Sequence, residues 1–281
     1  MYETEQKKER VILVGISLSD AEDVDQSLDE LEELARTAGA ECVGRVIQKR
    51  ELIHPGTYVG KGKLDEIRDL LWETEADGII CDDELSPAQI GNLKDELHTK
   101  IMDRTLLILD IFAQRAKTKE GRLQVELAQY QYLLPRLTGM WTHLTRQNAA
   151  GGKSPIGTRG PGETQLETDR RHIHRKIDKL REDLEEVRRV RGTQRQQRMK
   201  NEIPVVAIVG YTNAGKSTLL NALTGAAIPA NNRLFDTLDT TSRLLAVSDM
   251  MDVVISDVTL FIQQCQRFCC SIIRTMPMSV R

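Results

Sequence analysis

The chain has 281 residues, of which 40% are hydrophobic and 29% charged, and its formal net charge is −3. These proportions are ordinary for a globular protein of about two domains. The sequence has no apolar run long enough for a membrane helix and no apolar segment after the charged N-terminus, so we expect neither a membrane span nor a signal peptide. Five cysteines without metal-ligand spacing favour reduced thiols in a cytoplasmic protein.

Residues 11–104 alternate between apolar runs and amphipathic segments. The predicted strands are 11–16, 42–47, 78–81 and 101–103, and the predicted helices are 21–38, 64–72 and 86–97. This alternation is typical of a parallel sheet covered by helices. We therefore predict a parallel α/β domain over residues 1–104.

Two polar segments of this domain carry weaker signals. The glycine-rich stretch 54–63 precedes a helix and is compatible with a phosphate site, although a structural turn explains it better. Asp82, Asp83 and Glu84 follow a strand at the edge where α/β sheets often hold ligands. Because we identify no partner histidine or nucleophile for them, we interpret these carboxylates as a solvated loop.

Two heptad stripes follow, each with alternating steps of four and three residues. The stripes are Leu123, Leu127, Tyr130, Leu134 and Leu137, and then Ile173, Ile177, Leu180, Leu184 and Val187. Matching stripes joined by a loop predict an antiparallel helical hairpin over residues 105–200, with a kink at Pro135. Either stripe alone would also suit the buried face of a core helix.

The loop between the stripes, residues 148–166, is rich in glycine. Residues 141–200 hold 15 Lys/Arg against 8 Asp/Glu, whereas the whole chain is acidic. A thin basic finger suits a crevice lined with phosphates, where counterion release supplies affinity. We therefore predict RNA binding, against the alternative of solvated charges on a flexible loop. The candidate RNA-binding residues are Lys153, Arg159, Arg170 and Arg171.

The most specific pattern is Gly-x-x-x-x-Gly-Lys-Ser, between an apolar β-branched run and an apolar-periodic segment. A phosphate-binding loop requires this strand–loop–helix context, because its backbone N–H groups hold phosphate oxygens at a helix N-terminus. Lys216 would reach the β and γ phosphates, and the Ser217 hydroxyl would bind Mg²⁺. An ordinary glycine turn is the weaker alternative. The candidate nucleotide-binding residues here are Gly210, Tyr211, Thr212, Asn213, Ala214, Gly215, Lys216, Ser217 and Thr218.

Four stretches together resemble the HflX family, translation-factor GTPases related to Obg. They are residues 157–171, 209–221, 54–63 and 123–129. The resemblance implies an α/β domain, a helical hairpin and a P-loop G domain, the last at residues 201–281. It also implies GTP or GDP with Mg²⁺ as cofactors, and binding to the large ribosomal subunit and its RNA with the hairpin tip toward the peptidyl transferase region. Members are associated with splitting stalled or idle ribosomes, notably under stress, and we expect a monomer.

The same resemblance assigns the remaining site residues. The segment that matches switch I consists of Phe235, Asp236, Thr237, Leu238 and Asp239. It makes Thr237 the expected second Mg²⁺ ligand and, with Lys216, an expected catalytic residue. Thr240 stands where the family usually has proline. Asp257 matches the aspartate that holds Mg²⁺ through water.

The match fails inside the motif that Asp257 opens. Leu260 stands where the family has a glycine whose N–H meets the γ-phosphate and whose flexibility permits the switch. Beyond Gln264 the sequence resembles nothing in the family, and no Asn-Lys-x-Asp motif for reading guanine follows the phosphate loop. These departures lead us to expect a truncated or frame-shifted G domain, with a parallel sheet reduced to about three strands (203–209, 243–248 and 253–257), and an aggregation-prone C-terminal region.

Three interpretations stay open from the sequence. The first is a GTPase that binds ribosomes, in which Phe261 occupies the usual place of a water-orienting glutamine, so that hydrolysis depends on other groups such as the bound ribosome. The second is a non-catalytic remnant that binds the ribosome or RNA. The third, an ATP-using P-loop protein of another class, is disfavoured by the resemblance.

Overall fold

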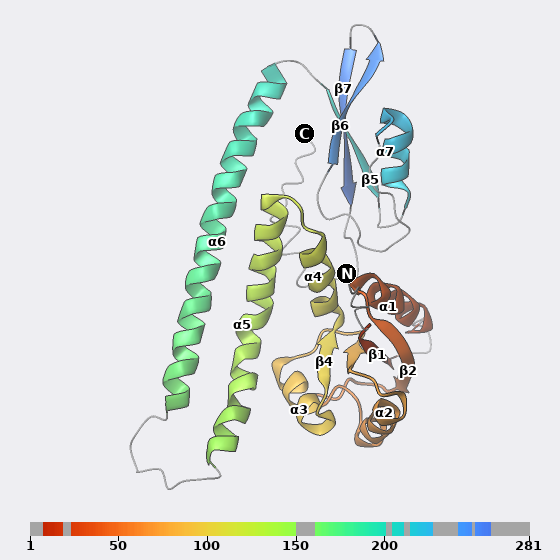
Figure 1. Cartoon of the computed structure of the whole chain (residues 1–281), viewed down its shortest axis with the longest axis vertical. Helices are drawn as coiled ribbons and strands as arrows, with labels where there is room; N and C mark the ends of the chain where they lie inside the picture. The colour runs from red at the N-terminus through yellow and green to blue at the C-terminus, as the bar shows by residue number, and fades with distance from the viewer. Residues whose placement is uncertain are drawn as a thin grey trace, which may run out of the picture. The chain divides into compact units, whose positions relative to one another are not determined.

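The computed structural model describes residues 8–18, 24–149, 161–200, 204–210, 214–226, 241–248 and 251–259. It divides into two compact units, residues 1–110 with 129–177 and residues 111–128 with 178–281. The first unit holds a sheet with its helices and the distal half of a helical hairpin. The second holds the proximal half of the hairpin and a second sheet (Figure 1).

The sheet of the first unit has four strands in the order β2-β1-β3-β4. These strands are β1 (Arg10–Ser17), β2 (Glu41–Lys49), β3 (Gly78–Cys81) and β4 (Lys100–Asp103). All of their pairings are parallel, which confirms the predicted parallel α/β domain. All four residues of β3 are buried, as expected for an inner strand of a parallel sheet.

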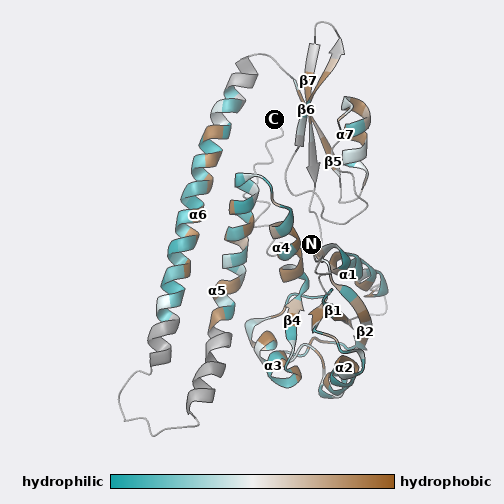
Figure 2. Cartoon of the chain, viewed as in Figure 1, coloured by the Kyte–Doolittle hydropathy of each residue, from teal (hydrophilic) through white to brown (hydrophobic). Residues whose placement is uncertain are grey.

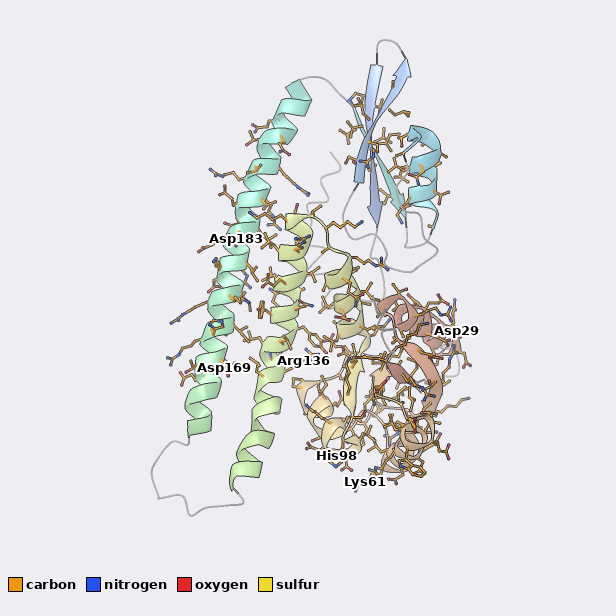
Figure 3. The ribbon with its side chains drawn as sticks, in the orientation of Figure 1. Asp29, Lys61, His98, Arg136, Asp169 and Asp183 are labelled. Carbon is orange, nitrogen blue, oxygen red and sulfur yellow. The ribbon has the colours of Figure 1, made fainter. Side chains whose placement is uncertain are left out.

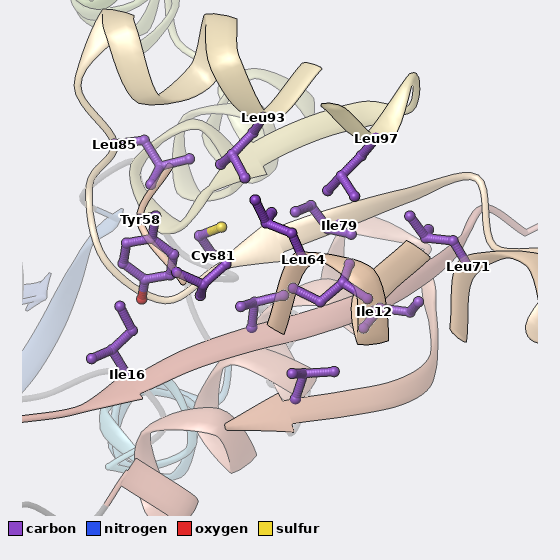
Figure 4. Close-up of a cluster of buried hydrophobic side chains, with 14 residues drawn as sticks. Ile12, Ile16, Tyr58, Leu64, Leu71, Ile79, Cys81, Leu85, Leu93 and Leu97 are labelled. Atoms are coloured by element: carbon purple, nitrogen blue, oxygen red, sulfur yellow. The ribbon is translucent and has the colours of Figure 1, made fainter. Parts of the chain in front are cut away.

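Three helices cover this sheet, α1 (Val24–Ala38), α2 (Lys61–Thr74) and α3 (Pro87–Leu97). The apolar faces of α2 and α3 meet the strands in one core, in which their leucines pack against Ile12 and Ile79 (Figure 4). The buried leucines of α1, Leu28, Leu31 and Leu34, lie outside this core. Ser86 caps α3 in a reciprocal capping box with Gln89, and Pro87 occupies the first turn. The capping residues thus place the start of α3 where its leucines can pack against the sheet.

The hairpin follows a helix that the sequence did not predict, α4 (Arg104–Arg115). Its arms are α5 (Lys119–Ala149), which continues through Pro135, and α6 (Pro161–Lys200). The residues of both predicted stripes are buried or half-buried. Lys176 donates to the Tyr130 hydroxyl and Arg191 pairs with Glu120, so the arms run antiparallel as predicted.

The outer surface of α6 is mostly hydrophilic, as Figure 2 shows by colour. Exposed pairs within one turn lie on it, such as Arg171 with Glu167 and Arg189 with Glu186. Exposed pairs of this kind contribute little to stability. The buried apolar stripes and the contacts between the arms, Lys176 with Tyr130 and Arg191 with Glu120, therefore join the two arms.

The second sheet has three strands in the order β5-β7-β6. They are β5 (Val205–Gly210), β6 (Thr241–Ser248) and β7 (Met251–Thr259), and α7 (Lys216–Thr224) packs against them through Leu220. β5 pairs with β7 in parallel, but β6 pairs with β7 antiparallel, so the expectation of a wholly parallel sheet is wrong at β6. Only two residues separate β6 from β7, and a parallel pairing needs a much longer crossover.

Candidate functional site

The predicted phosphate loop lies between the end of β5 and the start of α7. β5 ends at Gly210, and Gly215 precedes α7 with φ 79° and ψ 13°, a left-handed conformation that glycine adopts without strain. Because the cap residue is glycine, no cap side chain covers this helix N-terminus, where the first backbone N–H groups have no partner within the helix. The arrangement suits an anion, as the sequence predicts.

Lys216 folds back over the beginning of the loop. Its side chain is 7% exposed, and its Cδ lies 3.5 Å from the position that a β-carbon on Gly210 would occupy. Ala214 approaches the same position at 3.9 Å. Ser217 follows in the first turn of α7 and is half-buried. The structure thus brings the lysine stem, the glycine and the hydroxyl-bearing turn together around one loop.

Asp257 lies on β7, near the end of the second sheet from which the phosphate loop leaves β5. In the parallel register of β5 and β7, Ile208 pairs with Asp257 and Gly210 pairs with Thr259. The backbone of Asp257 therefore lies on the strand next to the one that enters the phosphate loop. The carboxyl ends of parallel strands are where α/β folds place their ligands.

Several predicted site residues lie outside the described part of the chain. They are Tyr211, Thr212, Asn213, Phe235, Asp236, Thr237, Leu238, Asp239, Lys153 and Arg159. Thr218 is exposed on α7, and Arg170 and Arg171 are exposed on α6. Of these two arginines, Arg171 shares its charge with Glu167.

The glycine-rich stretch 54–63 forms a structural turn. The Nδ1 atom of His54 accepts hydrogen bonds from the backbone N–H groups of Gly56 and Thr57, at 3.3 and 3.1 Å. The backbones of His54 and Tyr58 also bond to each other in both directions. This agrees with the interpretation as a turn.

Asp82 contradicts the interpretation of residues 82–84 as a solvated loop. Its carboxylate accepts from the Ser27 hydroxyl and from Arg104, each at 2.6 Å, and Arg104 also pairs with Glu30 at 2.7 Å. The Asp82 side chain is 14% exposed and that of Arg104 is 8% exposed. Sequence reasoning missed this cluster because its members come from separate elements, and no local pattern joins them.

Asp83 is also engaged, since it accepts a hydrogen bond of 2.8 Å from the Tyr58 hydroxyl. Burial and the neighbouring Asp83 carboxylate raise the pKa of Tyr58 far above its ordinary value. The neutral phenol is therefore the form that the folded protein holds. The contact ties the turn to the edge of the sheet.

Comparison with known proteins agrees with this arrangement. Models described as GTP-binding GTPase N-terminal, GTP-binding GTPase Middle Region and 50S ribosome-binding GTPase match residues 25–113, 115–198 and 205–267, respectively. Over 264 residues the chain is 57% identical to GTPase HflX of Lacrimispora saccharolytica, covering 94% of this chain and 61% of that protein. The chain belongs to the HflX family of GTPases.

A second relative, GTPase HflX of Escherichia coli K12, is 45% identical over 263 residues, covering 94% of this chain and 60% of its own length. The chain thus spans about three-fifths of the family members that it matches. A crystal structure described as a complex of SsGBP and GDP shares the fold, with a TM-score of 0.51 at 22% identity, over 90% of this chain and 64% of that one. Among the described residues, no helix combines the length and apolarity that crossing a membrane requires.

Proposed function

We propose that this chain binds GTP and GDP through its phosphate loop and docks on the large ribosomal subunit through its hairpin. The observation that carries the first part is the loop between β5 and α7. There, Gly215 opens the helix in a left-handed conformation and Lys216 folds over Gly210. A helix N-terminus without a cap side chain and an adjacent lysine together suit a chain of phosphates.

Mg²⁺ fits the same loop by the chemistry of its donors. This ion keeps several waters and takes only one or two protein ligands beside substrate phosphates. Ser217 supplies a hydroxyl in the first turn of α7, and Asp257 is carried by the strand next to β5. We assign Ser217 and Thr237 as the direct ligands and Asp257 as a partner through water. The ion would neutralise phosphate charge when it is bound.

For hydrolysis we propose that Lys216 contacts the β and γ phosphates and that Thr237, in switch I, binds Mg²⁺. Phe261 offers no polar group to orient a water molecule, so we expect turnover to require the ribosome. The names of the matched relatives, which are described as GTPases, support this assignment. The exposed Arg170 on α6 and the lysine and arginine of the tip loop are the proposed RNA contacts.

Equilibrium binding of fluorescent GDP with Mg²⁺, competed by GTP and by ATP, tests the nucleotide proposal. We expect GTP to displace the probe and Lys216→Ala to abolish binding. Competition by ATP measures whether this chain, in which no Asn-Lys-x-Asp motif follows the phosphate loop, distinguishes the base. Equal displacement by ATP would refute selectivity for guanine while leaving the phosphate loop in place. If Lys216→Ala bound the probe as the parent does, the assignment of the loop would be wrong.

Co-sedimentation with purified large ribosomal subunits tests the docking proposal separately. Lys216→Ala should still sediment with the subunits, because the hairpin supplies the contacts. Replacing Lys153 and Arg159 together should release the chain into the supernatant at moderate salt. Full retention of that variant would contradict docking through the tip.

A further inference from the structure

One fully buried carboxylate joins four segments of the first unit. Asp103 ends β4, and its Oδ1 accepts from the backbone N–H of Leu106 at 2.8 Å, which caps the start of α4. Its Oδ2 accepts from the N–H of Leu85, in the loop between β3 and α3, at 3.1 Å. The same oxygen accepts from the Tyr132 hydroxyl of α5 at 2.7 Å.

Arg136, one turn farther along α5, completes this group. Its Nη2 lies 3.6 Å from Oδ2 of Asp103, and it donates to the carbonyl oxygen of Leu85 at 2.8 Å and to Glu84 at 3.2 Å. The guanidinium carbon stands 3.4 Å from the centre of the Tyr132 ring. Figure 3 labels Arg136 on α5 among the side chains of this unit.

These contacts differ in kind from the apolar stripes along the arms of the hairpin. A leucine stripe gains similar burial at neighbouring registers, since apolar contacts have no direction. A buried carboxylate with fixed donors is satisfied only where those donors meet it, and displacement leaves charges without partners. Asp103, Tyr132 and Arg136 therefore specify where α5 meets the sheet.

We propose that Asp103, Tyr132 and Arg136 form a lock that fixes the distal half of the hairpin, residues 129–177, to the N-terminal sheet. Through this lock the sheet and the distal hairpin behave as one rigid body that carries the tip. The inference goes beyond the proposed function, because it concerns how the hairpin is held and depends on neither nucleotide nor ribosome.

The location of the lock supports this role. It lies at the carboxyl edge of a parallel sheet, where α/β folds place small ligands. Here the chain's own guanidinium groups stand beside carboxylates at the ends of these strands, Arg104 at Asp82 and Arg136 at Asp103. In this chain, the carboxyl ends of the strands thus hold α5.

Spin-label distance measurements on the full chain test the proposal directly. One label replaces Glu73 on α2 and the other replaces Arg175 on α6, two exposed residues of the same unit. Four cysteines are first changed to serine, namely Cys42, Cys265, Cys269 and Cys270. Cys81 stays, because burial raises the pKa of its thiol and shields it from the label.

The parent should give one narrow distance distribution. Tyr132→Phe, which removes a single hydroxyl, and Arg136→Met should each broaden or shift it. The matched control is Tyr130→Phe, which removes a hydroxyl from the same helix that contacts Lys176 instead of Asp103, and it should leave the distribution unchanged.

Circular dichroism must show the same helix content in every variant, and Arg136→Lys replaces Arg136→Met if the latter unfolds. Distributions that match the parent in both lock variants would overturn the proposal. Equal broadening in Tyr130→Phe would overturn it as well, since any loss from α5 would then have the same effect. Because no ribosome or nucleotide is present, failure here leaves the proposed function untouched.

Discussion

The side chain of Lys216 lies across Gly210, with its Cδ 3.5 Å from the place that a β-carbon on the glycine would take. That separation is ordinary van der Waals contact, so the folded chain has room for a methyl group at this position. A phosphate-binding loop, however, needs its backbone to approach the phosphates closely. A methyl group on Gly210 should therefore fit the folded chain but hinder the bound phosphates.

We expect Gly210→Ala to keep the parent's free energy of unfolding within about 1 kcal/mol while weakening the binding of fluorescent GDP. The two quantities are measured by urea denaturation and by fluorescence titration. Unchanged binding would show that the ligand does not approach this part of the loop.

At Gly215, unlike Gly210, the folded backbone itself requires glycine, because its φ of 79° is left-handed. A β-carbon in this conformation meets the following carbonyl oxygen, which costs roughly 1–2 kcal/mol. We therefore expect Gly215→Ala to destabilise the second unit by about that amount, measured by urea denaturation. Gly192, within α6 and open to solvent, provides the matched control. Gly192→Ala should stabilise the same unit by about 0.5–1 kcal/mol, and a loss of stability there would refute this account.

Alkaline pH should destabilise the first unit. Burial, assisted by neighbouring carboxylates, raises the pKa of Cys81, Tyr58 and Tyr132. These neutral side chains contribute fully to the free energy of unfolding below the pKa values that they have in the unfolded chain, about 8.5 for the thiol and about 10 for the phenols. As the pH rises above those values, the unfolded chain loses its protons first and the contribution falls. Each group costs up to about 1.4 kcal/mol per pH unit in that range.

Urea denaturation between pH 7 and 10.5 measures this loss. Cys81→Ala should lower stability at neutral pH, because it leaves a cavity, and should remove the earliest part of the decline. A decline that begins at the same pH in this variant would assign it to other groups.

Arg170 and Arg171 should contribute unequally to RNA binding. Both are exposed on α6, but Arg171 is paired with Glu167 and Arg170 has no ion pair among the described side chains. Arg170→Ala should therefore reduce the salt slope of ribosome binding by about one unit, as expected for a lost phosphate contact. Arg171→Ala should have a smaller effect. Arg181→Ala, which removes an exposed arginine paired with Asp178, is the control in the same assay.

Sequence reasoning predicted those parts of the fold that depend on local patterns. Strand–helix alternation gave the parallel sheet, and the steps of four and three gave both arms of the hairpin. It missed α4, which lies within the residues predicted as the hairpin, and the direction of β6, which depends on the short connection to β7. Local periodicity does not encode which strands become neighbours.

The same distinction holds for the candidate site. The phosphate loop was predictable because its glycines, lysine and serine lie within eight consecutive residues. The surroundings of Asp82 and Asp103 were not, since Ser27, Arg104, Tyr132 and Arg136 reach them from three different helices. From the sequence alone, a polar residue between a strand and a helix is predicted to lie in a solvated loop, because the distant residues that bury it are not known.

Among the described strands, β5 has a neighbour on one side only, and Val205, Val206 and Val209 of this strand are about half exposed. A bare strand edge beside apolar side chains is a template on which any extended segment can add, including the same strand of another molecule. Protein concentration therefore becomes an experimental variable. Nucleotide titrations at micromolar and at millimolar concentrations of the chain would therefore sample different mixtures of single and associated molecules.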